Sequence, residues 1–370
     1  MKKTDRNALI AFLVVSGIGV LVAWAGSQGG QTLAGIPLFT LAVVLVFLVQ
    51  WLVFIPSYLK QTEKFFDLTG SLTYISVVTL SLLFSKGADA RAILLWALVV
   101  IWAARLGTFL FRRIHRQGKD DRFDELKPNF LRFLNVWTIQ GLWVTFTMAA
   151  ALVVITSARR VEIDIFAILG LLIWVLGFSM EALADAQKNR FNADPANKGK
   201  FIHTGLWSRS RHPNYFGEIV IWVGVAVIAL PVLQGWQWVA LISPAFVALL
   251  ITRISGVPIL EKQADARWGG QEDYETYKAR TPVLIPRPPA APAPSRRRGW
   301  SPCRPTSGPS RSRWPTPPSP AGASRSPSRR GHRGRGWPTR SRRGGGSGRV
   351  CGRRRRAGAP IVPSRRRRPR

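Results

Sequence analysis

The stretch 205–218 places polar side chains directly before an apolar run, where they could bind an anion: Arg209, Arg211, His212, Asn214, Tyr215 and Glu218. Pro213 suits the first turn of a helix, so Asn214 and Glu218 are expected on one helical face. The amino end of that helix offers unpaired N–H groups, and the two arginines add positive charge beside it. The stretch therefore predicts a phosphate or carboxylate site. The alternative is a basic loop that only fixes membrane orientation, with Glu218 paired to a neighbouring arginine.

A second polar cluster lies at the end of the preceding apolar run. Glu181, Asp185 and Lys188 fall there at helical spacing, and Arg190 follows closely. Such a cluster could hydrogen-bond the ribose or base of a nucleotide while arginines hold its phosphates. A solvated helix end with pairs three or four residues apart is an equally good interpretation. Arg105, inside another apolar run, is a candidate for function, for helix pairing or for extension to the membrane interface.

These residues must be positioned by membrane helices, because apolar runs long enough to cross a bilayer recur along the first 286 residues. The eight candidates are Ala8–Ala25, Leu33–Ile55, Leu68–Phe84, Ala92–Phe111, Val136–Thr156, Ile163–Leu183, Tyr215–Leu230 and Trp238–Ile254. The first could instead be a signal peptide, but its length favours a span. The sequence predicts an all-α fold, a polytopic membrane helix bundle of about seven to eight transmembrane helices.

Lysine and arginine gather in alternate loops, the pattern of membrane proteins that keep their basic loops in the cytoplasm. The basic segments are those around Arg6, Lys64, 112–132 and 188–211, and the loops between them carry few positive charges. This pattern puts both termini and the polar clusters on the cytoplasmic side. We expect an integral, multi-pass membrane protein. Because the C-terminal tail has the composition of a GC-rich gene, we expect the membrane to be a bacterial inner membrane.

The tail 287–370 differs in composition from the rest of the chain. It contains 25 arginines, no lysine and no acidic residue, and it supplies most of the formal net charge of +34. It is predicted to be disordered, because it cannot bury a core. A basic arm that binds nucleic acid or anionic lipid is one interpretation. Because its residues are mostly those of GC-rich codons, we favour an out-of-frame product and exclude the tail from the fold.

Several common chemistries have no signature in the sequence. No strand is followed by a Gly-x-Gly-x-x-Gly fingerprint, and there is no Walker-type loop, His-Glu-x-x-His or Gly-x-Ser-x-Gly motif. His115, His203 and His212 are too scattered to predict a metal site, and both cysteines lie in the tail. A nucleotide cofactor would therefore have to be held between helices.

Further motifs surround these clusters: Asp121–Lys127, Trp137, Gln140–Trp143, Asp185–Phe191, Gly199–Phe201, and Tyr274 and Tyr277 before Thr281-Pro282 and Ile285-Pro286. With the stretch 205–218, they make the chain from about Val46 to Pro286 resemble the DUF1295 branch of the steroid 5-alpha-reductase-like membrane proteins. Relatives of that group include the isoprenylcysteine carboxyl methyltransferases. The resemblance divides the chain into N-terminal membrane spans (1–45), a reductase-like membrane domain (46–286) and the tail (287–370).

The resemblance implies a helical membrane enzyme that uses NADPH to reduce an activated carbon–carbon double bond in a steroid-like or other lipid. Positions that match the family's cofactor-binding residues are His212, Asn214, Tyr215, Glu218, Asp185 and Arg122. Arg190, Arg209 and Arg211 complete the predicted cofactor site as phosphate-binding residues.

Reduction of an enone needs a hydride and a donor at the developing oxyanion. Tyr74, or else Tyr58, is the predicted donor, and Glu218 is predicted to anchor the nicotinamide amide beside the reacting atoms. The expected partners are a lipid or steroid-like substrate and the bilayer, with no metal, no nucleic acid on the first 286 residues and no obligate protein partner.

Two other functions remain open. An S-adenosylmethionine-dependent methyltransferase fits because such relatives share an Arg-His-Pro-x-Tyr-x-Gly motif and a late acidic segment, which Glu261, Trp268 and Tyr274 match in part. A non-enzymatic multi-span protein, such as a transporter or scaffold, would be favoured by repeated halves, which the sequence does not show.

Overall fold

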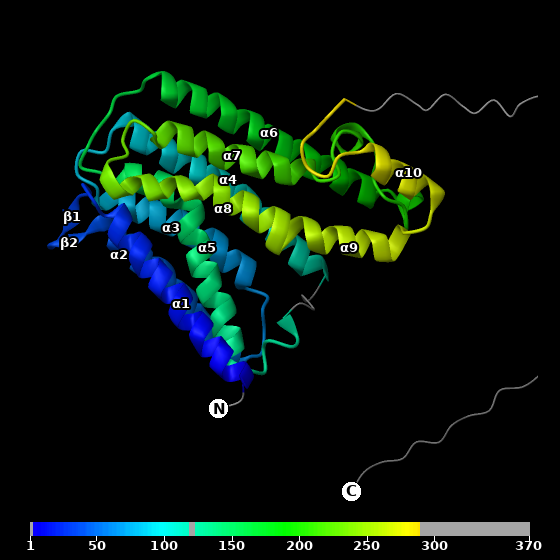
Figure 1. Cartoon of the computed structure of the whole chain (residues 1–370), viewed down its shortest axis with the longest axis horizontal. Coiled ribbons are helices and arrows are strands. Elements are labelled where there is room, and N and C mark those ends of the chain that lie inside the picture. The colour runs from blue at the N-terminus through cyan, green and yellow to red at the C-terminus, as the bar shows by residue number, and fades with distance from the viewer. Residues whose placement is uncertain (1–2, 118–122, 289–370) are drawn as a thin grey trace, which may run out of the picture. The chain divides into compact units, whose positions relative to one another are not determined.

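The computed structural model describes residues 3–117 and 123–288, and the chain there is mostly helical (Figure 1). Its elements are α1 (Lys3–Gly26), β1 (Thr32–Leu33), β2 (Ile36–Pro37), α2 (Leu38–Leu59), α3 (Phe66–Phe84), α4 (Ala90–Gln117), α5 (Phe130–Thr156), α6 (Ile165–Ala193), the 3₁₀ helices η2 (Pro195–Asn197) and η3 (Gly205–Ser208), α7 (Pro213–Ala229), the 3₁₀ helix η4 (Gly235–Leu241), α8 (Ile242–Leu249), the π-helix η5 (Leu250–Ile254), α9 (Gly256–Trp268) and α10 (Glu272–Arg280). Seven described segments are long and apolar enough to cross a membrane, and α7 is a shorter apolar helix. The predicted all-α membrane bundle is confirmed.

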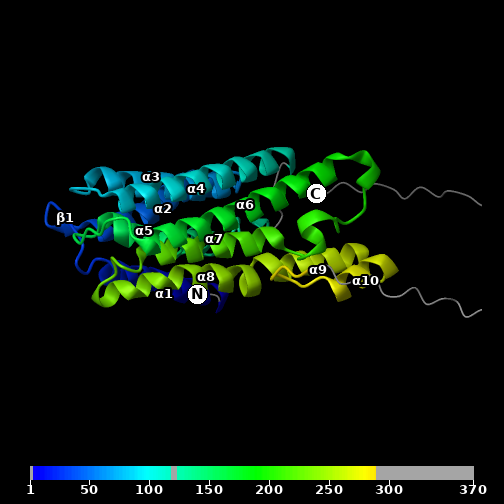
Figure 2. The ribbon, with the colours of Figure 1, turned by 90° about the horizontal axis from the view of Figure 1, so that it is seen from above.

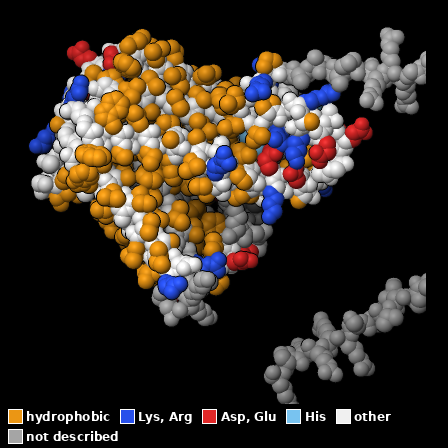
Figure 3. Space-filling model, viewed as in Figure 1, with side chains coloured by type: hydrophobic (Ala, Val, Ile, Leu, Met, Phe, Trp, Pro, Cys, Tyr) orange, Lys and Arg blue, Asp and Glu red, His pale blue; other side chains and the backbone are white. Residues whose placement is uncertain are grey.

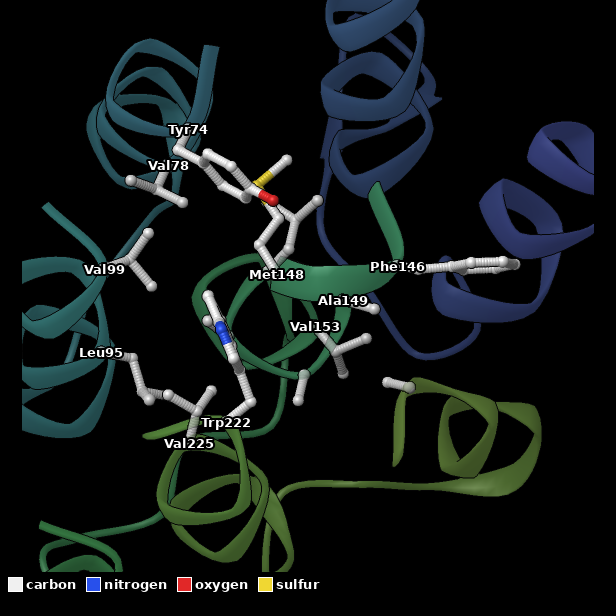
Figure 4. Packing of buried hydrophobic residues seen from close by; sticks show 14 of the residues in the cluster. Tyr74, Val78, Leu95, Val99, Phe146, Met148, Ala149, Val153, Trp222 and Val225 are labelled. Atoms are coloured by element: carbon white, nitrogen blue, oxygen red, sulfur yellow. The ribbon is translucent and has the colours of Figure 1, made fainter. Parts of the chain in front are cut away.

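The central helix of the bundle is α5, which is buried along most of its length and is contacted by α1, α2, α3, α4, α7 and α8. Small residues such as Ala149, Ala150 and Ala151 let the neighbouring helices approach it closely. Figure 4 shows side chains of α3, α4 and α7 converging on α5, with Tyr74 and Trp222 close to Met148, whereas Phe146 points to the opposite side. This packing fixes α3, α4 and α7 around one apolar core.

Hydrogen bonds between loops show that the helices alternate in direction. The loops that are predicted to lie on one side of the membrane bond each other. The Gln31 amide donates to the carbonyl oxygens of Lys86 and Ser157, at 2.9 and 3.0 Å, and Gln237 donates to the carbonyl of Gln28. Three connections and η4 therefore meet at one end of the bundle. The predicted alternation holds, and the assignment of the opposite end to the cytoplasm stays a prediction.

Several helix boundaries differ from those predicted. The second span begins at Leu38 rather than Leu33, because Ala34 and Gly35, both with positive φ, form the turn of a two-stranded hairpin before it. The fifth begins earlier, at Phe130, where the Asn129 side chain caps the helix. The sixth extends to Ala193, beyond the predicted end at Leu183, and the second polar cluster lies on this continuous helix, as its helical spacing predicts.

Apolar side chains cover the middle of the surface, and charged side chains gather towards its ends, most densely over α9 and α10 (Figure 3). Exposed Leu13, Leu52 and Leu172 belong to three different spans, which is the arrangement expected where helices face lipid. The described helices belong to one compact unit within residues 1–297. The proposed tail, 287–370, lies outside the described residues except for its first two positions, and the domain boundaries stay a prediction.

Candidate active site

The antiparallel pair of α6 and α7 makes the most extensive helix contact in the described part of the chain (Figure 2). Glycines seven residues apart line the contact on both helices: Gly170 and Gly177 face Gly224 and Gly217. A methyl group on Gly177 would lie 2.7 Å from the Gly217 carbonyl oxygen and from the Ile221 nitrogen. Only glycine permits this approach, which brings the carboxyl-terminal half of α6 against the first turns of α7.

One turn beyond Gly177, two carboxylates of α6 share one guanidinium of α4. Arg105 Nη1 lies 2.6 Å from Glu181 Oε1, and Arg105 Nη2 lies 2.6 Å from Asp185 Oδ2. Both acids are buried, and the Arg105 side chain is 19% exposed. Of the interpretations left open for Arg105, helix pairing is the one that the structure shows.

Residues of α7 complete this cluster. Asn214 lies beside Asp185, and Glu218, one turn later, lies near Glu181, Asp185 and Arg105. We call these five residues the carboxylate cluster. The cluster holds three carboxyl groups and one guanidinium, which bonds Glu181 and Asp185, so it has more acceptors than its own donors can satisfy. Its spare acceptors can take hydrogen-bond donors from a ligand.

One spare acceptor is directly identifiable. Trp102 faces the Glu181 carboxylate, but Trp102 Nε1 and Glu181 Oε2 are not in hydrogen-bonding geometry with any described residue. A buried carboxylate oxygen without a partner is costly, and such atoms often mark a ligand position.

Beside the cluster, Tyr74, Trp102 and Trp222 form an aromatic box from α3, α4 and α7. The Trp102 ring centroid lies 5.1 Å from that of Tyr74 and 4.9 Å from that of Trp222, both edge to face. The Tyr74 hydroxyl lies next to Thr147 but forms no hydrogen bond to any described residue. It is close enough to Glu218 for an electrostatic interaction. A phenol donor thus lies in an apolar core next to the carboxylate cluster.

The start of α7 forms a separate contact, with α9. Pro213 occupies the first turn as predicted, and the preceding His212 places its Nε2 2.7 Å from Glu261 Oε1. Arg211 pairs with the other oxygen of Glu261. The Tyr215 ring stacks on His212 with centroids 5.7 Å apart. Arg211, His212 and Tyr215 therefore lie on the α9 side of α7, and His212 Nδ1 and Arg211 Nε are buried without a partner among the described residues.

The connector between α6 and α7 is held to α6 and to α10. Trp207 Nε1 donates to the Ala184 carbonyl at 3.0 Å, and the Tyr277 hydroxyl donates to the Trp207 carbonyl at 2.7 Å. Burial raises the pKa of Tyr277 and, aided by its hydrogen bond to Asp265, raises the pKa of Tyr274 to about 12. Both phenols are therefore protonated hydrogen-bond donors at neutral pH.

The remaining predicted site residues lie elsewhere. Arg190, in the last turn of α6, and Arg209 are exposed and lie at the surface around the cluster rather than within it. Arg122 lies outside the described residues. Close to it in sequence, Lys127 bonds Glu63 at 2.7 Å and Asp124 at 2.9 Å; burial alone would lower the pKa of Lys127, but these bonds raise it. Tyr58 stacks on Phe54, away from the aromatic box.

The cofactor site predicted from the sequence does not include Arg105, Glu181 or Glu261, although Arg105 and Glu181 are polar candidates and Glu261 matches the methyltransferase pattern in part. The useful signal was a single arginine within one span and two acids four residues apart on another. Trp102 and Trp222 had no comparable signal, since many tryptophans of this chain suit an interface equally well.

The region that matches a known protein family contains the candidate site. The model of the family described as "Protein of unknown function (DUF1295)" matches residues 53–281, more than half of the chain, and includes the carboxylate cluster and the aromatic box. Neither a curated protein nor a solved structure matches the chain significantly. The chain belongs to the DUF1295 family.

Proposed function

We propose that the protein is a membrane-embedded, NADPH-dependent reductase of an activated carbon–carbon double bond in a steroid-like or other lipid. The observation that carries the proposal is the contact between the carboxylate cluster and the aromatic box. Acceptors for a polar cofactor and a buried phenol donor lie side by side in an otherwise apolar core. The family resemblance seen in the sequence supports the same chemistry.

The residues present suit a nicotinamide cofactor. Glu181 Oε2 is a buried acceptor without a partner, which fits an amide or hydroxyl donor. Asn214 and Glu218 line the same face of α7, and the N–H groups at the amino end of this helix suit a phosphate. When bound, NADPH supplies the hydride.

The protein's own residues then have distinct roles. The Tyr74 hydroxyl carries a proton, and no described residue accepts a hydrogen bond from it. It can therefore donate this hydrogen bond to a developing oxyanion. Glu218 orients the nicotinamide through its amide, and Arg105 keeps Glu181 and Asp185 in place. The apolar side chains around Tyr74 exclude water from the proposed reaction site.

Calorimetric titration of NADPH into the full chain in mild detergent tests the proposal. We expect saturable binding that Glu218→Gln or Asp185→Asn weakens by roughly one to two decades, because a charge-assisted hydrogen bond is worth about 1.5–3 kcal/mol. Glu162→Gln, an exposed carboxylate outside the cluster, is the control. Unchanged affinity in folded Glu218 and Asp185 variants would refute this cofactor site.

One observation favours a second candidate, an S-adenosylmethionine-dependent methyltransferase. Arg211 and His212 bond Glu261, so the Arg-His-Pro segment and the late acidic segment meet at one place. Titration of S-adenosylmethionine into the same samples decides between the two: binding of S-adenosylmethionine alone supports methyl transfer. If a folded sample binds neither cofactor, a non-enzymatic membrane protein is favoured.

A further inference from the structure

A groove with a volume of about 520 Å³ lies between α1 and α2, away from the candidate active site. Its lining residues fall between Ser16 and Trp51. All of them precede residue 53, where the match to the family begins. The groove therefore belongs to the part of this chain that the family match does not include.

The lining changes in polarity along the groove. At one end, the hydroxyls of Ser27 and Thr40 bond each other at 2.8 Å. The amide nitrogen of the half-buried Gln28 lies 3.4 Å from the Trp24 carbonyl oxygen. This long, weak hydrogen bond leaves the Gln28 amide able to donate to a ligand. Towards the other end, the lining is mostly apolar, with Phe47 and Leu48. An occupant with a polar end and a long apolar tail matches this gradient.

The depth of the groove indicates the kind of tail. From Ser27 to Ser16, a helix rises about 17 Å. That length is roughly half of a hydrocarbon core about 30 Å thick, so the groove spans one leaflet. Gln28 lies two residues beyond Gly26, the last residue of the first candidate span, and is therefore expected near the level of the lipid ester groups.

The lining suits an apolar chain better than a protein segment. No charged residue lines the groove to pair with a charged partner. A single hydrocarbon chain is narrow enough to fit.

We propose that the groove binds one acyl chain of a bilayer phospholipid, with its ester carbonyl accepting a hydrogen bond from the Gln28 amide. The tail lies between α1 and α2 and packs on Gly19, Phe47 and Leu48. This lipid is held by the protein rather than consumed by it, since the groove is separate from the carboxylate cluster.

Two glycines of α1 provide a matched test. A methyl group on Gly19 would lie 2.9 Å from two carbons of the Phe47 ring, which also lines the groove, so Gly19→Leu places a bulky side chain in the groove wall. Gly17 has nothing within 4 Å, so Gly17→Leu adds the same side chain outside the groove. Both changes replace glycine by a better helix former, and backbone effects therefore cancel in the comparison.

Native mass spectrometry of the full chain, reconstituted in phosphatidylglycerol and phosphatidylethanolamine vesicles and extracted in mild detergent, measures retained phospholipid. We expect one tightly held phospholipid on the wild type and on Gly17→Leu, and about tenfold less on Gly19→Leu, the effect of losing contact with about two methylene groups. Gln28→Leu should reduce retention while leaving the thermal midpoint unchanged.

Equal retention by the Gly19 and Gly17 variants, or no retained phospholipid on the wild type, would overturn the proposal. So would a dimer that only Gly19→Leu disrupts, because the occupant would then be a second copy of the chain. NADPH affinity should be the same in all four proteins, which separates this result from the test of the reductase proposal.

Discussion

Replacing Arg105 by methionine should destabilise the protein strongly, because it removes the only guanidinium that pairs with Glu181 and Asp185 in the described structure. Methionine keeps the apolar stem of the side chain but lacks the guanidinium. The two lost bonds are both 2.6 Å long, and the carboxylate side chains are only 5% and 11% exposed, so solvent cannot replace the guanidinium.

The expected magnitude follows from this geometry. Each charge-assisted hydrogen bond contributes about 1.5–3 kcal/mol, and removing one member of a buried ionic group typically costs about 3–5 kcal/mol. At about 2–4 °C per kcal/mol, the thermal midpoint in detergent should fall by roughly 10 °C. Arg190→Met removes an exposed arginine from α6 and should change the midpoint by at most about 2 °C.

The assay is thermal unfolding of the full chain in one detergent at one scan rate, followed by intrinsic tryptophan fluorescence. A triple variant, Arg105→Met with Glu181→Gln and Asp185→Asn, should recover most of the loss because the two carboxylates that bond Arg105 are then neutral amides. A midpoint for Arg105→Met within 2 °C of that of Arg190→Met would show that the cluster does not stabilise the bundle.

Three further predictions concern other contacts. Gly177→Ala should destabilise the bundle by about 1–3 kcal/mol through overpacking of α6 on α7, whereas Gly17→Ala, which meets nothing, should be neutral or stabilising; equal midpoints would contradict the close helix contact. Tyr74→Phe should leave stability within about 1 kcal/mol, because the hydroxyl has no described partner, but should lower reductase turnover on an enone lipid about 100-fold; full turnover would exclude Tyr74 as the donor. Burial alone would raise the pKa of Asp164, but its bonds to Arg91 and to the α6 amides lower it, so the stabilisation is present above the unfolded pKa of about 4 and is lost as the pH falls through the folded value. The midpoint of Asp164→Asn should therefore fall less than that of the wild type below pH 4, and parallel acid profiles would refute this assignment.

The sequence predicted the helical elements well, because membrane spans can be recognised from their length and apolar content. Its errors lie at helix ends, where local chemistry decides. The hairpin before α2 depends on two residues with positive φ. At the end of α6, the Glu181 and Asp185 side chains bond Arg105 rather than water, and the helix continues past them.

The candidate site was predicted in part. Asn214 and Glu218 share a face of α7, as their spacing requires, and Asp185 joins them. The stretch 205–218 nevertheless divides between two contacts, since Arg211 and His212 turn towards Glu261 on α9. Helical periodicity gives the face on which a residue lies, but it does not identify the helix that this face meets.

By itself, the amino-acid sequence determined that the chain is a bundle of membrane helices with alternating direction, that Pro213 starts a helix, and that the polar residues gather at one end. Those properties depend on hydropathy, on loop charge and on the local conformational preferences of single residues. Only the tertiary structure decided that Arg105 joins Glu181 and Asp185, that Tyr74 stands in a box of two tryptophans, and that α1 and α2 leave a groove. Each of these depends on how closely two distant helices approach, and in this chain small residues such as Gly19, Gly177 and Gly217 set that distance.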